Sequence, residues 1–150
     1  MASNPFNSSI KINSLKKRTH KTTLQKPDIN VALIANDMTI HKQIIDLLSA
    51  MNIQTIAHTK VQNLIDSLNE QPTHCLIIET ELDDMHGVTL FKKLLVIYRG
   101  LPPTIMIGVR NASTVEAVEV MALGAIDYIE KPFSSRQLIV SLNHALESTI

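Results

Sequence analysis

The sequence predicts one α/β domain, a doubly wound five-stranded parallel sheet with helices on both faces, in a (βα)5 arrangement. Two observations lead to this prediction. Short, continuously apolar runs, which are typical of strands covered on both faces, alternate five times with segments whose apolar residues recur at helical spacing. The connections are short, which favours right-handed crossovers between parallel strands.

The first three units follow this pattern in turn. Residues 31–35 predict a strand, and a helix with Thr39 as its N-cap is expected to follow it. Residues 53–57 predict the second strand, and Thr59 is expected to open the second helix. The third run, residues 75–79, is the most apolar and predicts a central strand, with a polar loop and a third amphipathic helix behind it.

The fourth unit begins with a strand expected over residues 104–107. Ser113 and Glu116 have the spacing of a capping box and predict the start of the next helix. The apolar residues of this helix that are expected to face inward are Val115, Val118 and Met121.

The fifth unit combines a strand over residues 126–129 with a helix whose start Ser134 and Gln137 mark as a second capping box. Lys131 follows the strand. A lysine in this place is expected to face an anion or a carboxylate, because an unpaired ammonium group is costly to bury. Pro132 removes an amide donor from the strand ladder and is a candidate for a cis peptide bond.

Length and charge suggest how the chain is divided. The 150 residues, 45% of them hydrophobic, suffice for one domain with a substantial core. The net charge of zero is uneven, since residues 1–28 carry six Lys or Arg side chains against one Asp. We therefore expect a basic, disordered N-terminal arm, residues 1–28, and an acidic domain, residues 29–150.

Several classes of protein are disfavoured by what the sequence lacks. A single cysteine, Cys75, excludes an internal disulfide framework and favours a reducing compartment. No apolar run reaches the roughly 18 residues that cross a membrane, and no secretory signal opens the chain, so a cytoplasmic protein is expected. The histidines lack ligand spacing, and no glycine-rich phosphate loop follows the first strand, which argues against a metal centre and a nucleotide-binding enzyme.

Chemically active side chains follow the ends of the predicted strands. Asn36 and Asp37 come after the first strand, Glu79 ends the third, and Lys131 follows the fifth. Because the carboxyl ends of parallel strands meet at one edge of a sheet, we expect these side chains to share a crevice there.

This arrangement, together with Asp84-Met85-His86-Gly87 and residues 122–133, resembles the receiver domain of bacterial response regulators. The resemblance extends over residues 29–150. It implies the flavodoxin-like (CheY-like) fold and a role in two-component, phosphorelay signal transduction. In such a domain an aspartate accepts a phosphoryl group, an acidic pair holds Mg²⁺, a lysine binds phosphoryl oxygens and a hydroxyl side chain senses the product.

The acceptor and metal positions depart from the family pattern. Glu79 stands at the acceptor position, where its extra methylene group is expected to carry the carboxylate outward and to prevent attack on a phosphoryl donor. Ala35 and Asn36 stand at the acid-pair positions, with Asp37 one residue late. Mg²⁺ prefers charged oxygen ligands, so Asn36 and Asp37 are expected to bind it weakly, and no cofactor is predicted.

The sensing position departs as well, while the lysine is retained. The hydroxyl position falls at Gly108 or Val109, neither of which can donate a side-chain hydrogen bond, and Tyr128 occupies the switch-aromatic position. Lys131 is intact, with Glu79 as its expected partner. As a partly exposed pair they are expected to contribute about 1 kcal/mol or less, and to imitate the phosphorylated arrangement or lock one conformer.

The sequence thus predicts a single-domain pseudo-receiver. It is expected to have no enzymatic activity and to bind a histidine kinase, a downstream effector or a second copy of itself without phosphorylation. The resemblance places this contact on the face of the fourth helix, fifth strand and fifth helix, and no membrane or nucleic-acid partner is expected.

Two alternatives remain open. One is a conventional receiver that uses Asp37 for the metal and Asp83 or Asp84 as acceptor. The other is a nucleic-acid-associated regulator that acts through the basic arm.

Overall fold

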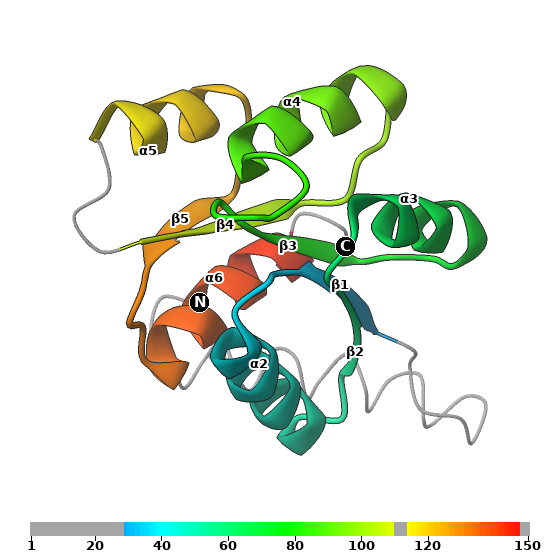
Figure 1. Cartoon of the computed structure of the whole chain (residues 1–150). Coiled ribbons are helices and arrows are strands. Elements are labelled where there is room, and N and C mark those ends of the chain that lie inside the picture. Colours follow the sequence, from blue (N-terminus) through cyan, green and yellow to red (C-terminus); the bar gives the residue numbers. More distant parts are fainter. Residues whose placement is uncertain (1–28, 110–113, 148–150) are drawn as a thin grey trace.

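The computed structural model describes residues 29–109 and 114–147, which form a five-stranded parallel sheet between two layers of helices (Figure 1). The order across the sheet is β2-β1-β3-β4-β5. The predicted doubly wound, flavodoxin-like fold is confirmed. The strands are β1 (Asn30–Ile34), β2 (Gln54–His58), β3 (Cys75–Glu79), β4 (Thr104–Gly108) and β5 (Asp127–Glu130).

The helices lie on both faces of this sheet, with α2 and α6 on one face and α3, α4 and α5 on the other (Figure 1). The chain passes from β1 outward to β2 and then returns to β3 on the other side of β1. The strand order reverses there, which places the loops after β1 and β3 beside the crevice of the sheet. The helices are α2 (Met38–Ala50), α3 (Val61–Glu70), α4 (Gly87–Ile97), α5 (Thr114–Ala122) and α6 (Ser135–Glu147).

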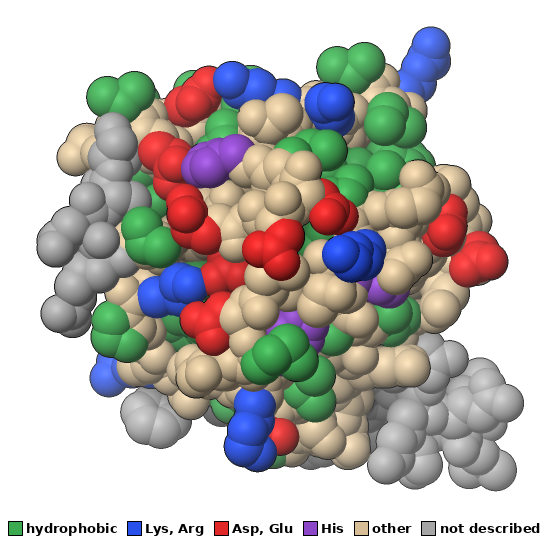
Figure 2. Space-filling view, viewed as in Figure 1, with side chains coloured by type: hydrophobic (Ala, Val, Ile, Leu, Met, Phe, Trp, Pro, Cys, Tyr) green, Lys and Arg blue, Asp and Glu red, His purple; other side chains and the backbone are tan. Residues whose placement is uncertain are grey.

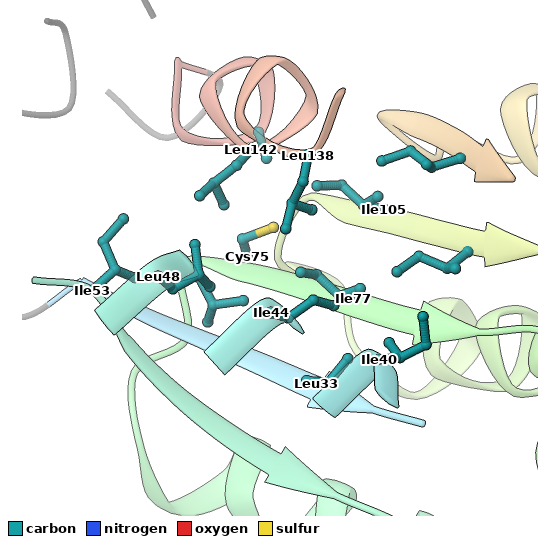
Figure 3. Packing of buried hydrophobic residues seen from close by; sticks show 14 of the residues in the cluster. Leu33, Ile40, Ile44, Leu48, Ile53, Cys75, Ile77, Ile105, Leu138 and Leu142 are labelled. Atoms are coloured by element: carbon teal, nitrogen blue, oxygen red, sulfur yellow. The ribbon is translucent and has the colours of Figure 1, made fainter. Parts of the chain in front are cut away.

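Two hydrophobic cores fill the space between the layers, because successive side chains of a strand point to opposite faces. Leu33, Ile77 and Ile105 pack against α2 and α6, and Figure 3 shows Ile44 and Leu138 from these helices among them. Cys75 lies in the same core, where burial raises the pKa of its thiol to about 12. This cysteine is therefore an unreactive packing residue. The residues of the second core include Ile34, Ile78, Met106, Leu90, Phe91 and Leu94.

The structure corrects two predicted helix starts. Asp37, and not Thr39, caps α2: its Oδ1 accepts a hydrogen bond from the Thr39 backbone N–H at 2.9 Å. Thr59 does not open α3, which begins at Val61, whose backbone N–H donates to Asp84 Oδ2 at 2.9 Å. A side chain from a distant loop thus supplies the cap.

The predicted inward face of α5 is wrong. Val115, Val118 and Met121 are 74%, 62% and 45% exposed, whereas Val120 is fully buried. Most positions of this helix are apolar, so the spacing of its apolar residues did not identify the stripe that packs on the sheet. Val115, Val118 and Met121 instead form an exposed apolar row, which we call the α5 row.

Of the remaining local predictions, one is confirmed and two concern residues outside the described ranges. The capping box of α6 is confirmed, since the Gln137 backbone N–H donates to Ser134 Oγ at 3.1 Å and the Ser134 N–H to Gln137 Oε1 at 2.9 Å. Ser113, the predicted cap of α5, and the basic arm, residues 1–28, lie outside the described residues. Among the described helices, none combines the length and apolar character required to span a bilayer.

Candidate functional site

The Glu79 side chain is enclosed at the carboxyl edge of the sheet. It is only 1% exposed, although the sequence predicted a carboxylate displaced outward. Its Oε1 accepts hydrogen bonds from the backbone N–H groups of Asn36 at 2.9 Å and Asp37 at 3.3 Å. Its Oε2 pairs with Lys131 Nζ. Both carboxylate oxygens are therefore occupied by groups of the chain itself.

Lys131 reaches this carboxylate from the loop after β5, and its peptide bond to Pro132 is cis. Its Nζ also lies 3.4 Å from Asp37 Oδ2. Burial on its own would lower the pKa of Lys131, but the bonds to Glu79 and then to Asp37 outweigh burial, so the net shift is upward. The lysine remains charged, with two carboxylates around it.

The burial of this pair changes its energetics. The side chain of Lys131 is 19% exposed and that of Glu79 is 1% exposed. The contribution of about 1 kcal/mol or less that is expected for a partly exposed pair therefore does not apply. Removing one partner of a buried pair leaves an uncompensated charge and costs about 3–5 kcal/mol. The pair is thus a strong constraint on the shape of the crevice.

Asn36 joins three loops at this edge. Its backbone N–H binds Glu79, its Nδ2 donates to the Thr59 carbonyl at 3.3 Å, and its Oδ1 accepts from the Asp83 backbone N–H at 2.7 Å. The loops after β1, β2 and β3 are therefore held together by one side chain. The amide oxygen that could have served as a metal ligand is already used.

The two other acid-pair residues are committed in different ways. Ala35 is fully buried and brings no side-chain oxygen. Asp37 caps α2 and contacts Lys131. Desolvation would raise the pKa of Asp37, but the bonds from Thr39 and Lys131 outweigh it and the pKa is lowered. This donor set does not fit Mg²⁺, which prefers several charged oxygens in octahedral geometry.

Within the described residues, no group of three or more His, Cys, Asp or Glu side chains has the arrangement of a metal site. Asp83 and Asp84, the alternative acceptors, are both exposed in the loop after β3. Asp84 caps α3, and the backbone of Asp83 donates to Asn36. Both residues therefore help to fix the loop.

Tyr128 fills the space beside Gly108, one of the two residues predicted for the sensing position. A β-carbon on Gly108 would lie 1.9 Å from Tyr128 Oη. The Tyr128 hydroxyl donates to Glu116 Oε2 at 2.6 Å, and burial followed by this bond raises the pKa of Tyr128. Val109, the other register, is 36% exposed and apolar. The aromatic ring thus lies where a hydroxyl-bearing side chain would begin.

Sequence reasoning named His86 and Glu116 but did not predict that they contact each other at this site. His86 is the N-cap of α4: its Nδ1 accepts from the Val88 backbone N–H at 3.3 Å, and its Nε2 lies 3.3 Å from Glu116 Oε1. The sequence feature that could have pointed to this region is Gly87, the first residue of α4. A β-carbon at this position would lie 2.4 Å from the Glu79 carbonyl oxygen, so glycine allows the helix start to approach the end of β3. Nothing in the sequence paired Glu116 with Tyr128.

Known proteins share this organisation. The family described as "Response regulator receiver domain" matches residues 31–143. Transcriptional regulatory protein FixJ of Azorhizobium caulinodans is 25% identical over 116 residues, 77% of this chain and 54% of that protein. FixJ of Rhizobium meliloti is 24% identical over 123 residues, 82% and 59% of the two chains. The chain spans slightly over half the length of these curated relatives.

Solved structures agree with this assignment at the level of the fold. The receiver domain of the Francisella response regulator 1452 matches with a TM-score of 0.72 at 22% identity, covering 82% of this chain and all of that one. NtrX from Brucella abortus matches with a TM-score of 0.74 at 22% identity, covering 82% of this chain and 28% of that one. The chain belongs to the receiver-domain family of response regulators, the modules of two-component signalling.

Proposed function

We propose that this receiver domain is a pseudo-receiver, which binds its partner protein without being phosphorylated. One observation carries the proposal: the Glu79 carboxylate is held in the crevice by Lys131 and by the backbone amides of Asn36 and Asp37. A negative charge is therefore permanently bound where the family would place a transient one.

The groups needed for phosphoryl transfer are otherwise engaged. Such a transfer depends on positioning and on neutralising charge at the phosphoryl group. Glu79 has no free oxygen for attack, Asn36 uses both polar atoms of its side chain within the fold, and Gly108 has no hydroxyl. These features support a signalling module that is neither an enzyme nor dependent on a cofactor.

The contact surface that we propose lies on α5, β5 and α6. A groove of about 610 Å³ runs between these elements, and Tyr128, Glu130 and Arg136 are among the residues that line it. The α5 row is exposed on the same helix that contributes Thr114 and Ala117 to this groove. Apolar side chains clustered on the surface of a small domain favour a binding site, here for a histidine kinase, a downstream effector or a second copy.

The fully buried Cys75 is compatible with the cytoplasmic location that we propose.

Phosphodonors test the proposal directly. The intact chain is incubated with acetyl phosphate and Mg²⁺, or titrated with beryllofluoride and Mg²⁺, beside a conventional receiver domain. We expect no gain in intact mass and no change in the NMR spectrum, whereas the conventional domain responds to both. Stoichiometric modification would overturn the proposal, and its location on Asp83 or Asp84 would establish the conventional alternative.

The surface is tested separately by capture of partners with the intact chain as bait. We expect the same partners with and without a phosphodonor, and their loss with Val118→Glu, which places a charge in the α5 row. Lys131→Ala, which removes the partner of Glu79, tests whether the crevice supports that surface. Partners that appear only after treatment with a phosphodonor would contradict the proposed independence.

A further inference from the structure

A series of polar contacts connects the loop after β3 to the proposed contact surface. His86 Nε2 lies 3.3 Å from Glu116 Oε1 on α5, and Glu116 Oε2 accepts the Tyr128 hydroxyl of β5 at 2.6 Å. A second carboxylate, Glu81 Oε2, lies 3.8 Å from the same histidine nitrogen. In Figure 2, Asp and Glu side chains gather around a histidine in the upper left of the face.

The bonds of His86 define which nitrogen carries its proton. Nδ1 accepts from the Val88 backbone N–H, so in the neutral ring Nε2 bears the hydrogen and faces Glu116 Oε1 at 3.3 Å. An imidazolium ring has hydrogen on both nitrogens and cannot accept from Val88. It would also place a positive charge at the positive end of the α4 dipole. A single proton therefore breaks the cap of α4.

Two carboxylates face the other ring nitrogen of His86, Nε2. Among the described residues, the carboxylates paired with His86 are Glu81 on its own loop and Glu116 on α5, and Glu116 also accepts the Tyr128 hydroxyl of β5. Both carboxylates are acceptors for an N–H group at Nε2, whereas the cap of α4 needs Nδ1 as an acceptor. Tyr128 keeps its proton near neutral pH because its pKa is raised. Among these side chains, imidazole is the type whose charge changes between pH 5 and 8.

We propose that protonation of His86 regulates the contact surface: the charged ring leaves the Val88 amide, pairs with Glu81 and Glu116, and draws Glu116 away from Tyr128. Tyr128 lines the groove between α5, β5 and α6, so its release changes the shape of that groove. The biological consequence rests on the proposed function, because it assumes that partners bind there. The linkage between His86 and Tyr128 does not depend on that assumption.

NMR spectroscopy of the intact chain between pH 5 and 8 tests the linkage without any partner. We expect the His86 ring, the Val88 amide and the Tyr128 ring to change with one common midpoint, with the Nε2–H tautomer at the alkaline end. His86→Asn retains a side chain that caps helices but does not titrate in this range. In this variant the Tyr128 and Val88 signals should stay constant with pH.

His144→Asn is the matched control, because His144 is an exposed histidine on α6. It should leave the common midpoint unchanged. The linkage is refuted if the Tyr128 signals in the unmodified chain ignore the His86 titration, or if they still titrate after His86→Asn. Labelling by a phosphodonor would refute the proposed function and leave this NMR result unaffected, so the two failures are distinguishable.

Discussion

The hydroxyl oxygen of Tyr128 occupies the space that a side chain on Gly108 would need, 1.9 Å from the position of its β-carbon. In the proposed register that puts Gly108 at the sensing position, the missing hydroxyl and the inward tyrosine are therefore a single feature. A residue with a side chain at 108 and the observed tyrosine ring cannot coexist. Glu116 stabilises the ring by accepting its hydroxyl proton in a hydrogen bond of 2.6 Å.

Gly108→Ala is predicted to expel the Tyr128 ring, because the clash involves the far end of a rotatable side chain rather than backbone. Loss of the bond to a charged Glu116 should lower the free energy of unfolding by about 1.5–3 kcal/mol. The pKa of Tyr128, which burial and then Glu116 raise, should fall toward its ordinary value. An ultraviolet titration of the phenol group and urea denaturation measure both effects.

The sign of the pH dependence follows from this shift. A tyrosine whose folded pKa is raised contributes stability that is present below the unfolded pKa, about 10, and is lost as the pH rises toward the folded pKa. Gly108→Ala should reduce this alkaline loss. Gly100→Ala is the control, because a β-carbon there meets no atom within 4 Å. An unchanged Tyr128 titration in Gly108→Ala would show that the ring remains in place.

Glu79→Gln is predicted to destabilise the fold strongly. The neutral amide leaves the charge of Lys131 without its closest partner in a site where Glu79 itself is 1% exposed. The free energy of unfolding should fall by about 3 kcal/mol or more, measured by urea denaturation. Glu70→Gln, at an exposed position near the end of α3, should stay within about 0.5 kcal/mol of the unmodified chain. Equal effects from the two changes would contradict the buried pair.

The sequence predicted the sheet because a strand covered on both faces needs a continuous apolar run, and the runs ending near Ile34 and Glu79 satisfy this condition. It also brought Lys131 to the same edge as Glu79, since parallel strands end together. Burial of the Glu79 carboxylate depends on two backbone amides in the loop at Asn36, and no side-chain pattern encodes where such amides point.

The errors on the helices have a similar origin. Asp84 caps α3 from a loop that follows later in the chain, so the residues that precede the helix, Thr59 among them, carry no signal for its start. On α5, apolar residues occur nearly all round the helix, and the neighbours that bury Val120 are distant in sequence. Tertiary contacts decided both cases.

Asp37 is predicted to combine two separable roles. Asp37→Asn should keep the cap of α2, because asparagine is an equally good N-cap, and should lose only the charge beside Lys131. Asp37→Ala should lose both, with an additional cost of about 1 kcal/mol in the free energy of unfolding. Urea denaturation of the two variants at neutral pH separates the roles, and equal stability of both variants would exclude the cap.

The acid dependence of stability should also change in Asp37→Asn. The pKa of Asp37 is lowered in the fold, so its contribution is present above the unfolded value, about 3.9, and is lost as the pH falls through the folded value. Asp37→Asn should therefore weaken the decline in stability below about pH 4. If the free energy of unfolding of the variant depends on acidic pH as that of the unmodified chain does, the charge of Asp37 does not contribute to stability.

Glu79→Asp alone is predicted not to restore phosphorylation by acetyl phosphate. The shorter carboxylate withdraws from Lys131, but Asn36 still supplies an amide in place of a metal-binding charge, and Gly108 still lacks a hydroxyl. Intact mass spectrometry in the presence of Mg²⁺ should show no adduct, and the same result is expected for Glu79→Asp combined with Asn36→Asp.

Labelling should require a third change, Gly108→Thr, because only this variant supplies the hydroxyl, and it does so by displacing Tyr128. The number of changes that are needed before labelling appears therefore shows which positions block phosphoryl transfer. Robust labelling of the single Glu79→Asp variant would show that the acceptor side chain alone blocks the chemistry and that the metal and hydroxyl positions are dispensable. Labelling that appears only with all three changes would show that the inward Tyr128 ring and the amide of Asn36 each prevent phosphoryl transfer independently.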